Sequence, residues 1–153
     1  LGSWDIIRNP KYANKIFIKD APRDVYCSVL IYLKQDELRE GKITLEELMY
    51  DSSDASIEAV ENYMKEVKGL VAGWEADFGK DQMIQERGWI NLTWSGDAVW
   101  AMNEADPIGV ELGYYVPDEG SSVWFDGWVI PNMPRILRLQ NTSSISSVSL
   151  KTL

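Results

Sequence analysis

The stretch KIFIKDAPRDVYCSVLIYL (residues 15–33) decides the fold, because it changes from the pattern of a strand to the pattern of a helix. Its first part, KIFIKD (15–20), is rich in β-branched and aromatic residues, which is typical of a buried strand. Pro22 is suited to the first turn of a helix. An apolar face then follows at helical spacing: Val25, Tyr26, Val29, Leu30 and Leu33. The stretch therefore predicts a strand that runs directly into a helix.

The same alternation of strands and helices continues along the chain. Further strands are predicted at 70–74, 89–94, 108–117 and 123–131. The helices predicted between them are the segment from the DSSD cluster (51–54) to Gly69, then 79–87, then 96–105. This alternation predicts an α/β fold, a three-layer α/β/α sandwich with a mainly parallel central sheet.

Single residues and short motifs mark the ends of several elements. Pro10 is expected to stop a short helical turn in WDIIRNPKY (4–12). Ser95 is expected to cap the helix at 96–105, because a serine side chain accepts a hydrogen bond from the first turn. TLEEL (44–48) is expected to form a single helical turn. The helix after DSSD is expected to pack on the core through an apolar face made of Ile57, Val60, Met64 and Val67.

The last 13 residues differ in composition from the rest. NTSSISSVSLKTL (141–153) contains five serines and two threonines, with no clean helical stripe and no long strand alternation. A segment of this kind has too few regularly spaced apolar side chains to pack against a core. We expect it to be loosely ordered.

The composition restricts the class of function. The chain has 24 Asp and Glu against 15 Lys and Arg, a net charge of -9, which disfavours nucleic acid and anionic membranes and favours a cationic ligand. It has no histidine, so histidine-based catalytic triads and zinc sites are excluded, and we expect no metal and no cofactor. Cys27 is the one cysteine, so an internal disulfide is excluded, and it is expected in the core. No stretch approaches the roughly 18 apolar residues of a membrane-spanning helix.

Three carboxylates lie where a ligand would be held. Asp24 and Asp97 follow predicted parallel strands, at the start of the next helix, and such sites gather ligands in open α/β sheets. Either residue can instead simply complement a helix dipole. Asp126 stands among bulky apolar residues in SSVWFDGWVIP (121–131), where a carboxylate needs a partner or solvent. From an edge strand it can point to water or accept hydrogen bonds from a loop.

Two tryptophans stand close to two of these acids. Trp94 lies three residues before Asp97 in WSGD, and Trp124 lies two residues before Asp126 in WFD. Tryptophan at a strand end is commonly a residue of the core rim, but its ring also offers a flat face to a cation. Carboxylates beside indole rings suit an elongated organic cation, with charge pairing for ammonium groups and apolar walls for methylenes.

These motifs carry a resemblance to a known family. NPKYANKIFIKDAPRDVY (9–26) and INLTWSGDAVWAMNEADPIGVELGYYVPDEGSSVWFDGWVIP (90–131) resemble the second lobe of the spermidine/putrescine-binding proteins of ABC transporters. These are a branch of the type II periplasmic-type solute-binding proteins, whose two α/β lobes close on the ligand. The resemblance implies that 1–135 is one lobe of that fold, with the first lobe absent, and that 136–153 is an atypical tail.

The resemblance also implies a role for each candidate residue. Asp24 is expected to pair with an amine, Trp94 to form a stacking wall and Asp97 to supply a second anion. Trp124 and Asp126 are expected to add a second wall and the main ammonium partner. The implied partners are a polyamine and, in the full-length protein, an ABC permease, with a periplasmic or extracellular location and no enzymatic activity. The surface exposed by the missing lobe makes a homodimer plausible.

Two other classes of function stay open from the sequence. One is a structural or regulatory domain that kept the fold and lost the ligand. The other is a glycoside hydrolase, because a pair of carboxylates near tryptophans also suits that chemistry. No hydrolase motif is present in the chain.

Overall fold

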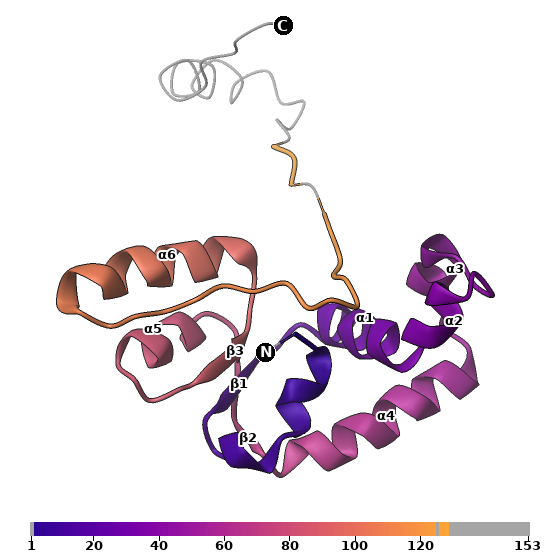
Figure 1. Cartoon of the computed structure of the whole chain (residues 1–153), viewed down its shortest axis with the longest axis horizontal. Helices are drawn as coiled ribbons and strands as arrows, with labels where there is room; N and C mark the ends of the chain where they lie inside the picture. Colours follow the sequence, from indigo (N-terminus) through magenta and orange to yellow (C-terminus); the bar gives the residue numbers. More distant parts are fainter. Residues whose placement is uncertain (1, 125, 129–153) are drawn as a thin grey trace, which may run out of the picture. The chain divides into compact units, whose positions relative to one another are not determined.

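The computed structural model describes residues 2–124 and 126–128. The chain divides into two compact units, Leu1–Ser122 and Val123–Leu153. The first unit contains every helix and strand that the described residues form (Figure 1). The elements are η1 (Trp4–Arg8), η2 (Pro10–Tyr12), β1 (Ile16–Lys19), α1 (Pro22–Leu33), α2 (Gln35–Arg39), α3 (Leu45–Tyr50), α4 (Asp54–Lys68), β2 (Val71–Glu75), α5 (Gly79–Ile84), β3 (Ile90–Leu92), α6 (Ser95–Ala105) and η3 (Asp106–Ile108).

The three strands form one parallel sheet in the order β2-β1-β3. β1 is the central strand, and all four of its residues are buried. Ile18 of β1 is in register with Trp74 of β2 and with Leu92 of β3. A central strand of a parallel sheet is covered on both faces, which explains why KIFIKD lacks the alternation of a half-exposed strand.

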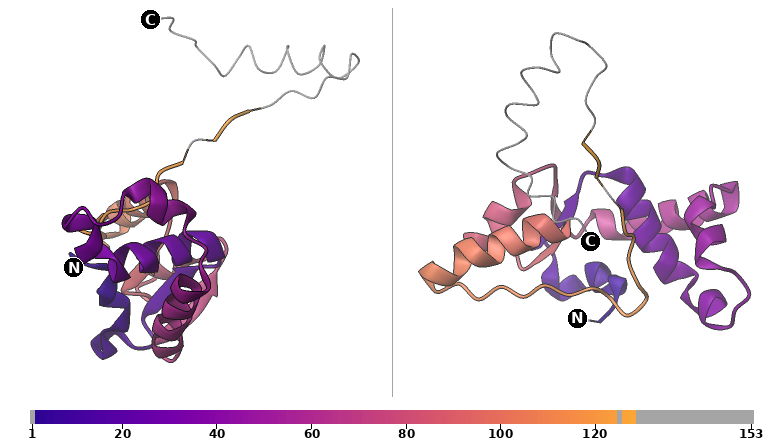
Figure 2. Two further views of the ribbon diagram at one scale, coloured as in Figure 1. Left: turned by 90° about the vertical axis from the view of Figure 1, so that its right-hand side faces the viewer. Right: turned by 90° about the horizontal axis from the view of Figure 1, so that it is seen from above.

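Helices cover both faces of the sheet, as the α/β/α prediction requires. Figure 1 shows α1 and α4 on one side of the strands and α5 and α6 on the other. The views in Figure 2 agree that α5 and α6 lie beside each other. The main core cluster joins η1, β1, α1, α3 and α4 through Ile7, Ile16, Ile18, Val25, Val29, Leu30, Ile31, Leu48, Val60, Tyr63 and Val67. The predicted fold class is confirmed.

Capping signals placed most helix starts correctly. Pro22 is the first residue of α1. Ser53 caps α4 by accepting a hydrogen bond from the Ser56 N–H, and Gly69 follows its last residue. Thr44 starts α3 with a reciprocal pair of hydrogen bonds to Glu47. The single turn predicted at TLEEL is therefore a short helix.

Two local predictions, at Ser95 and Ile57, were wrong. Ser95 is the first residue of α6 and Trp94 precedes it, with no side-chain cap, because Trp94 already has the extended backbone of a cap position. The turn predicted in WDIIRNPKY is η1, which stops before Pro10 as predicted, and Pro10 itself begins η2, since proline suits a first helical position. Val60 and Val67 of α4 are buried as predicted, but Ile57 is 47% exposed and Tyr63 is buried in the core with the two valines. The polar residues after α1 form the short helix α2, for which no prediction was made.

The strand predicted at 108–117 is also wrong. Ile108 ends η3, and Gly109 follows with a φ of 79°, a conformation that breaks a strand. Residues 110–117, all within the described chain, are extended but belong to no sheet. The segment that follows is held by the N-terminal turn instead: the Asp118 N–H donates to the Gly2 carbonyl at 2.9 Å, and the Trp4 indole donates to the Gly120 carbonyl at 2.8 Å. The sequence of 108–117 is typical of a strand, but it does not show whether a neighbouring strand is present to pair with it, and among the described residues none does.

The remaining predictions fall on or near the second unit. Of the strand predicted at 123–131, the described residues are not in a strand, and the others lie outside the described residues. The predicted boundary at 135 and the tail 136–153 also lie outside the described residues.

Two predictions about the first unit concern its core and its helices. Cys27 is buried, as predicted. Among the residues that the structure describes, no helix has the length and apolar character needed to cross a membrane.

Candidate functional site

Two of the predicted acids lie at the same edge of the sheet. Asp24 is in the first turn of α1, which follows β1, and Asp97 is in the first turn of α6, which follows β3. Because β1 and β3 are adjacent and parallel, their carboxyl ends lead into neighbouring helix starts. This is the edge at which open α/β sheets bind ligands.

Asp24 and Trp94 are in direct contact. The Trp94 indole N–H donates a hydrogen bond to Asp24 Oδ2 at 2.8 Å, across 70 residues of sequence. The Trp94 side chain is 40% exposed, so the ring stands at the rim of the fold and not in its core. A hydrogen bond to a carboxylate orients the indole, because its one donor has a single direction.

Lys19 links this pair to Asp97. It is the last residue of β1 and is 2% exposed. Its Nζ lies 2.8 Å from Asp97 Oδ2 and 4.2 Å from the centroid of the Trp94 ring. The ammonium therefore bridges a carboxylate and an aromatic face inside the fold, where charge pairing is stronger than in water.

Glu75 completes the buried charge cluster. It is the last residue of β2, in register with Lys19, and is 1% exposed. Its Oε1 lies 3.5 Å from Lys19 Nζ, and its Oε2 accepts a hydrogen bond from the Gly79 N–H at 3.0 Å. A Cβ on Gly79 would lie 2.6 Å from Glu75 Cδ and 2.7 Å from Asn91 Nδ2, so the start of α5 requires glycine.

Asp97 is held by two lysines through different oxygens. Lys80 Nζ lies 3.3 Å from Asp97 Oδ1, opposite the bond from Lys19 to Oδ2, and also pairs with Asp77. Burial raises the pKa of the Asp97 carboxyl, but the hydrogen bonds and charges of Lys19 and Lys80 outweigh it and hold that pKa below its usual value. Asp97 is therefore an anion that the fold itself neutralises.

The lowered pKa of Asp97 predicts a loss of stability in acid. A carboxyl with a depressed folded-state pKa stabilises the fold above its unfolded pKa of about 3.9, and this contribution is lost as the pH falls through the folded value. We expect the unfolding free energy of Asp97→Asn to fall less steeply than that of the wild type below about pH 4. Urea unfolding across this pH range measures both slopes.

Asp36→Asn is the control for this measurement. Asp36 is 85% exposed in its pair with Arg39, and its replacement should leave the wild-type slope unchanged. Equal slopes for Asp97→Asn and the wild type would contradict the assignment of acid sensitivity to the Asp97 pairs.

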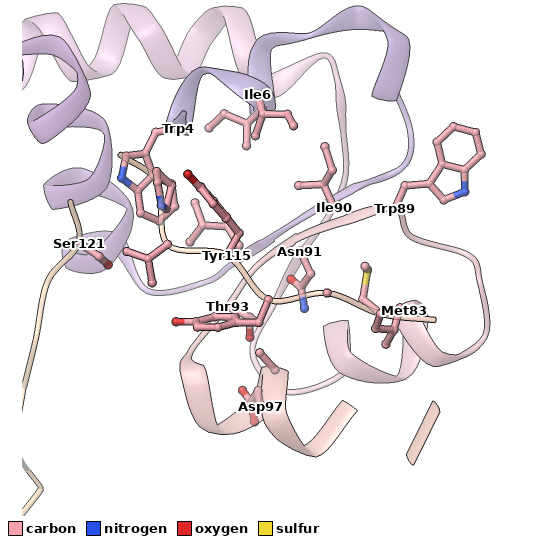
Figure 3. Close-up of a pocket in the computed structure, with 18 of the residues that line it drawn as sticks. Trp4, Ile6, Met83, Trp89, Ile90, Asn91, Thr93, Asp97, Tyr115 and Ser121 are labelled. Atoms are coloured by element: carbon pink, nitrogen blue, oxygen red, sulfur yellow. The ribbon is translucent and has the colours of Figure 1, made fainter. Parts of the chain in front are cut away.

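A cavity of about 190 Å³ lies beside the charge cluster, within the first unit. In Figure 3, Trp4 and Tyr115 stand toward one end and Met83 toward the other, with Asn91 and Thr93 of the β3 region between them. Asn91 Oδ1 and Thr93 Oγ1 are buried and have no hydrogen-bond partner among the described residues. Of the predicted site residues in this unit, Asp97 lines the cavity, whereas Asp24 and Trp94 do not.

The other two predicted site residues lie in the second unit. Trp124 is 47% exposed, and Asp126 is exposed. Their contact with a ligand stays a prediction. Among the described residues, no group of three or more acidic or cysteine side chains is arranged to hold a metal ion.

Sequence reasoning missed Lys19, Glu75 and Lys80. A signal was present, because both KIFIKD and VAGWE place a charged residue at the end of an apolar strand. An ionised side chain at such a position needs a partner of opposite charge. The pairing of Lys19 with Glu75 needs the strand register, which the sequence does not display.

Comparison with known proteins agrees with this fold. Residues 2–137 match the family model described as bacterial extracellular solute-binding protein. The structure is similar to the crystal structure of the spermidine/putrescine ABC transporter substrate-binding protein PotD from Streptococcus pneumoniae, in complex with calcium and HEPES. That match has a TM-score of 0.57 and 21% identity, and it covers 69% of this chain and 29% of the PotD chain. The search of curated proteins found no match.

The structural match bears on the fold, and the family model bears on family membership. The structural likeness supports the periplasmic-binding-protein fold, and the chain spans less than a third of the length of that relative. The family model covers most of the chain, from the N-terminal turn to beyond α6. The chain therefore belongs to the family of bacterial extracellular solute-binding proteins.

Proposed function

We propose that this chain is part of the substrate-binding component of an ABC transporter and binds an organic cation of the polyamine class. The observation that carries the proposal is the hydrogen bond between Trp94 and Asp24 at the ligand-binding edge of the sheet. It holds a carboxylate and an indole together, and this pair of groups recognises an ammonium on an alkyl chain.

The proposed recognition uses charge first and apolar contact second. A carboxylate has about four lone-pair sites, and the indole bond to Asp24 occupies one of them. A ligand ammonium can therefore donate to Asp24 while its methylenes lie against the exposed part of Trp94. Trp124 and Asp126 are proposed to add a second wall and a second anion, on the strength of the WFD motif.

The transport context is also part of the proposal. The solved relative is named as the substrate-binding protein of an ABC transporter. By that likeness, a permease is the proposed protein partner, and the periplasm or the outer cell surface is the proposed location. Trp128 is fully exposed. Because a large exposed apolar side chain can pack against a second copy of the chain, we also propose self-association.

A domain that has lost its ligand is the second candidate. The observation that favours it is the pairing of Asp97 with Lys19 and Lys80, because one of the predicted ligand anions is already neutralised within the fold. The hydrolase is not proposed, since the family and the solved relative are both named for solute binding.

Calorimetric titration with putrescine and spermidine tests the proposal. We expect binding that weakens as salt increases, because the contact is between charges. Asp24→Asn should weaken it by at least about tenfold, since a neutral amide cannot pair with an ammonium. Asp54→Asn, at the start of α4, is the control and should bind as the wild type does. No heat with either amine at millimolar concentration would overturn the proposal and favour the ligand-free domain.

A further inference from the structure

Lys19 makes the contacts that a bound amine would make. Its ammonium lies 2.8 Å from a carboxylate oxygen of Asp97, 3.5 Å from one of Glu75, and 4.2 Å from the centroid of the Trp94 ring. Anionic oxygens on one side and an indole face on another are the general requirements for holding an organic ammonium. The chain thus gives its own amine the kind of contacts that a ligand amine would need.

This internal amine is not available to solvent. Lys19 is 2% exposed, although Trp94 beside it is 40% exposed. Removing the ammonium from this cluster leaves the buried carboxylate of Glu75 without its counter-charge, which is unfavourable. A ligand ammonium therefore gains little by displacing Lys19, and the Trp94 face that Lys19 covers is closed to it.

The carboxylates around Trp94 divide into two that have an ion pair and one that has none among the described residues. Asp97 is paired through one oxygen with Lys19 and through the other with Lys80. Glu75 is paired with Lys19 and accepts from the Gly79 N–H. Asp24 accepts the Trp94 indole N–H and has no ion pair among the described residues. Of these three carboxylates around Trp94, that of Asp24 is the one left without an ion pair among the described residues, and it can pair with a ligand cation.

From this arrangement we infer that Lys19 is a specificity-determining residue, which limits the first unit to one ammonium group of its ligand. The inference rests on the proposed function, because it concerns the number of amines at the same site. An ammonium at Asp24 binds beside Trp94, while a second one directed toward Asp97 meets the positive charge of Lys19. Removal of that charge frees Asp97 Oδ2 as a second amine position, while Lys80 stays paired with Oδ1.

Two amines that share a carbon chain test this inference. Butylamine carries one ammonium and putrescine carries two, so the ratio of their dissociation constants reports whether a second amine position exists. Lys19→Met keeps a long apolar stem and removes the charge. We expect the preference for putrescine over butylamine to rise about tenfold in this variant, because the second ammonium of putrescine gains one charge-assisted contact. The affinity for butylamine should be nearly unchanged.

Lys15→Met is the matched control. Lys15 Nζ also lies over an indole, 5.5 Å from the Trp89 ring centroid, and its replacement removes the same charge from a different place. The control should keep the wild-type ratio, because Trp89 is not joined to Asp24 or Asp97. An equal rise in both variants would overturn the inference in favour of a general effect of net charge.

The outcomes separate this inference from the proposed function. If the wild type binds neither amine, the proposed function fails and the inference fails with it. If the wild type binds and Lys19→Met keeps the same ratio, Lys19 does not determine specificity and the proposed function stands. Circular dichroism checks that the variant is folded. Should it unfold, the double variant Lys19→Met, Glu75→Gln removes one buried carboxylate charge together with the ammonium and is measured in its place.

A measurement on the wild type needs no variant. Lys19 Nζ lies 4.2 Å from the centroid of the Trp94 ring, so the protons on the adjoining ε-carbon should show a ring-current shift in the NMR spectrum. If Lys19 stays in place, that shift persists when putrescine saturates the protein. Loss of the shift on saturation would mean that the ligand displaces Lys19, and it would overturn the inference even where binding is strong.

Discussion

Ile18→Ala is expected to lower the free energy of unfolding by about 2–5 kcal/mol. Ile18 is at the centre of β1, is 0% exposed, and belongs to the main core cluster. Truncating the Ile18 side chain removes buried apolar surface and leaves a cavity in the core. The cavity cannot close fully, because the sheet holds the helices on its two faces apart. Urea denaturation monitored by circular dichroism measures the change.

Ile57→Ala provides a matched control for this prediction. Ile57 of α4 is 47% exposed, so the same substitution removes little buried surface. Its effect should stay within about 0.5 kcal/mol, in part because alanine is a good helix former. Similar losses at both positions would contradict the burial of β1 between helices, and with it the layer order of the fold.

Gly79→Ala is expected to destabilise the fold by about 1–3 kcal/mol, the usual cost of overpacking. The added methyl group would lie 2.6 Å from Glu75 Cδ, and Glu75 is 1% exposed and paired with Lys19. Because the carboxylate has little room to move, the start of α5 must shift, and the hydrogen bond from the Gly79 N–H to Glu75 weakens. Thermal unfolding measures the loss.

The same substitution at Gly96 should have the opposite sign. Gly96 is the second residue of α6, and a Cβ there meets nothing within 4 Å. Alanine then stabilises the helix by about 0.5–1 kcal/mol through the lower entropy of the unfolded chain. Destabilisation by Gly96→Ala equal to that by Gly79→Ala would show that the Glu75 contact is not the cause.

The candidate site was only partly predictable. Asp24 and Asp97 were found because each follows a strand and starts a helix, a relation that is local in sequence. Their surroundings were not found. Lys19 reads as the polar end of a strand, yet it neutralises Asp97 and covers Trp94, because β1 lies between β2 and β3. The order of strands in a sheet is a property of long-range packing.

Local signals in this chain are strong where one residue type dictates the backbone. The β1–α1 unit, the Ser53 cap of α4 and the Gly69 end of that helix all follow from propensity, capping and apolar spacing, which act over a few residues. The segment 110–117 and the Lys19 cluster follow from which partners come within hydrogen-bonding or ion-pair distance. The contacts of the Lys19 cluster and of the N-terminal turn with Gly120 join residues 78 and 116 positions apart, so their free energy depends on the folded chain and leaves no trace in a short window of sequence.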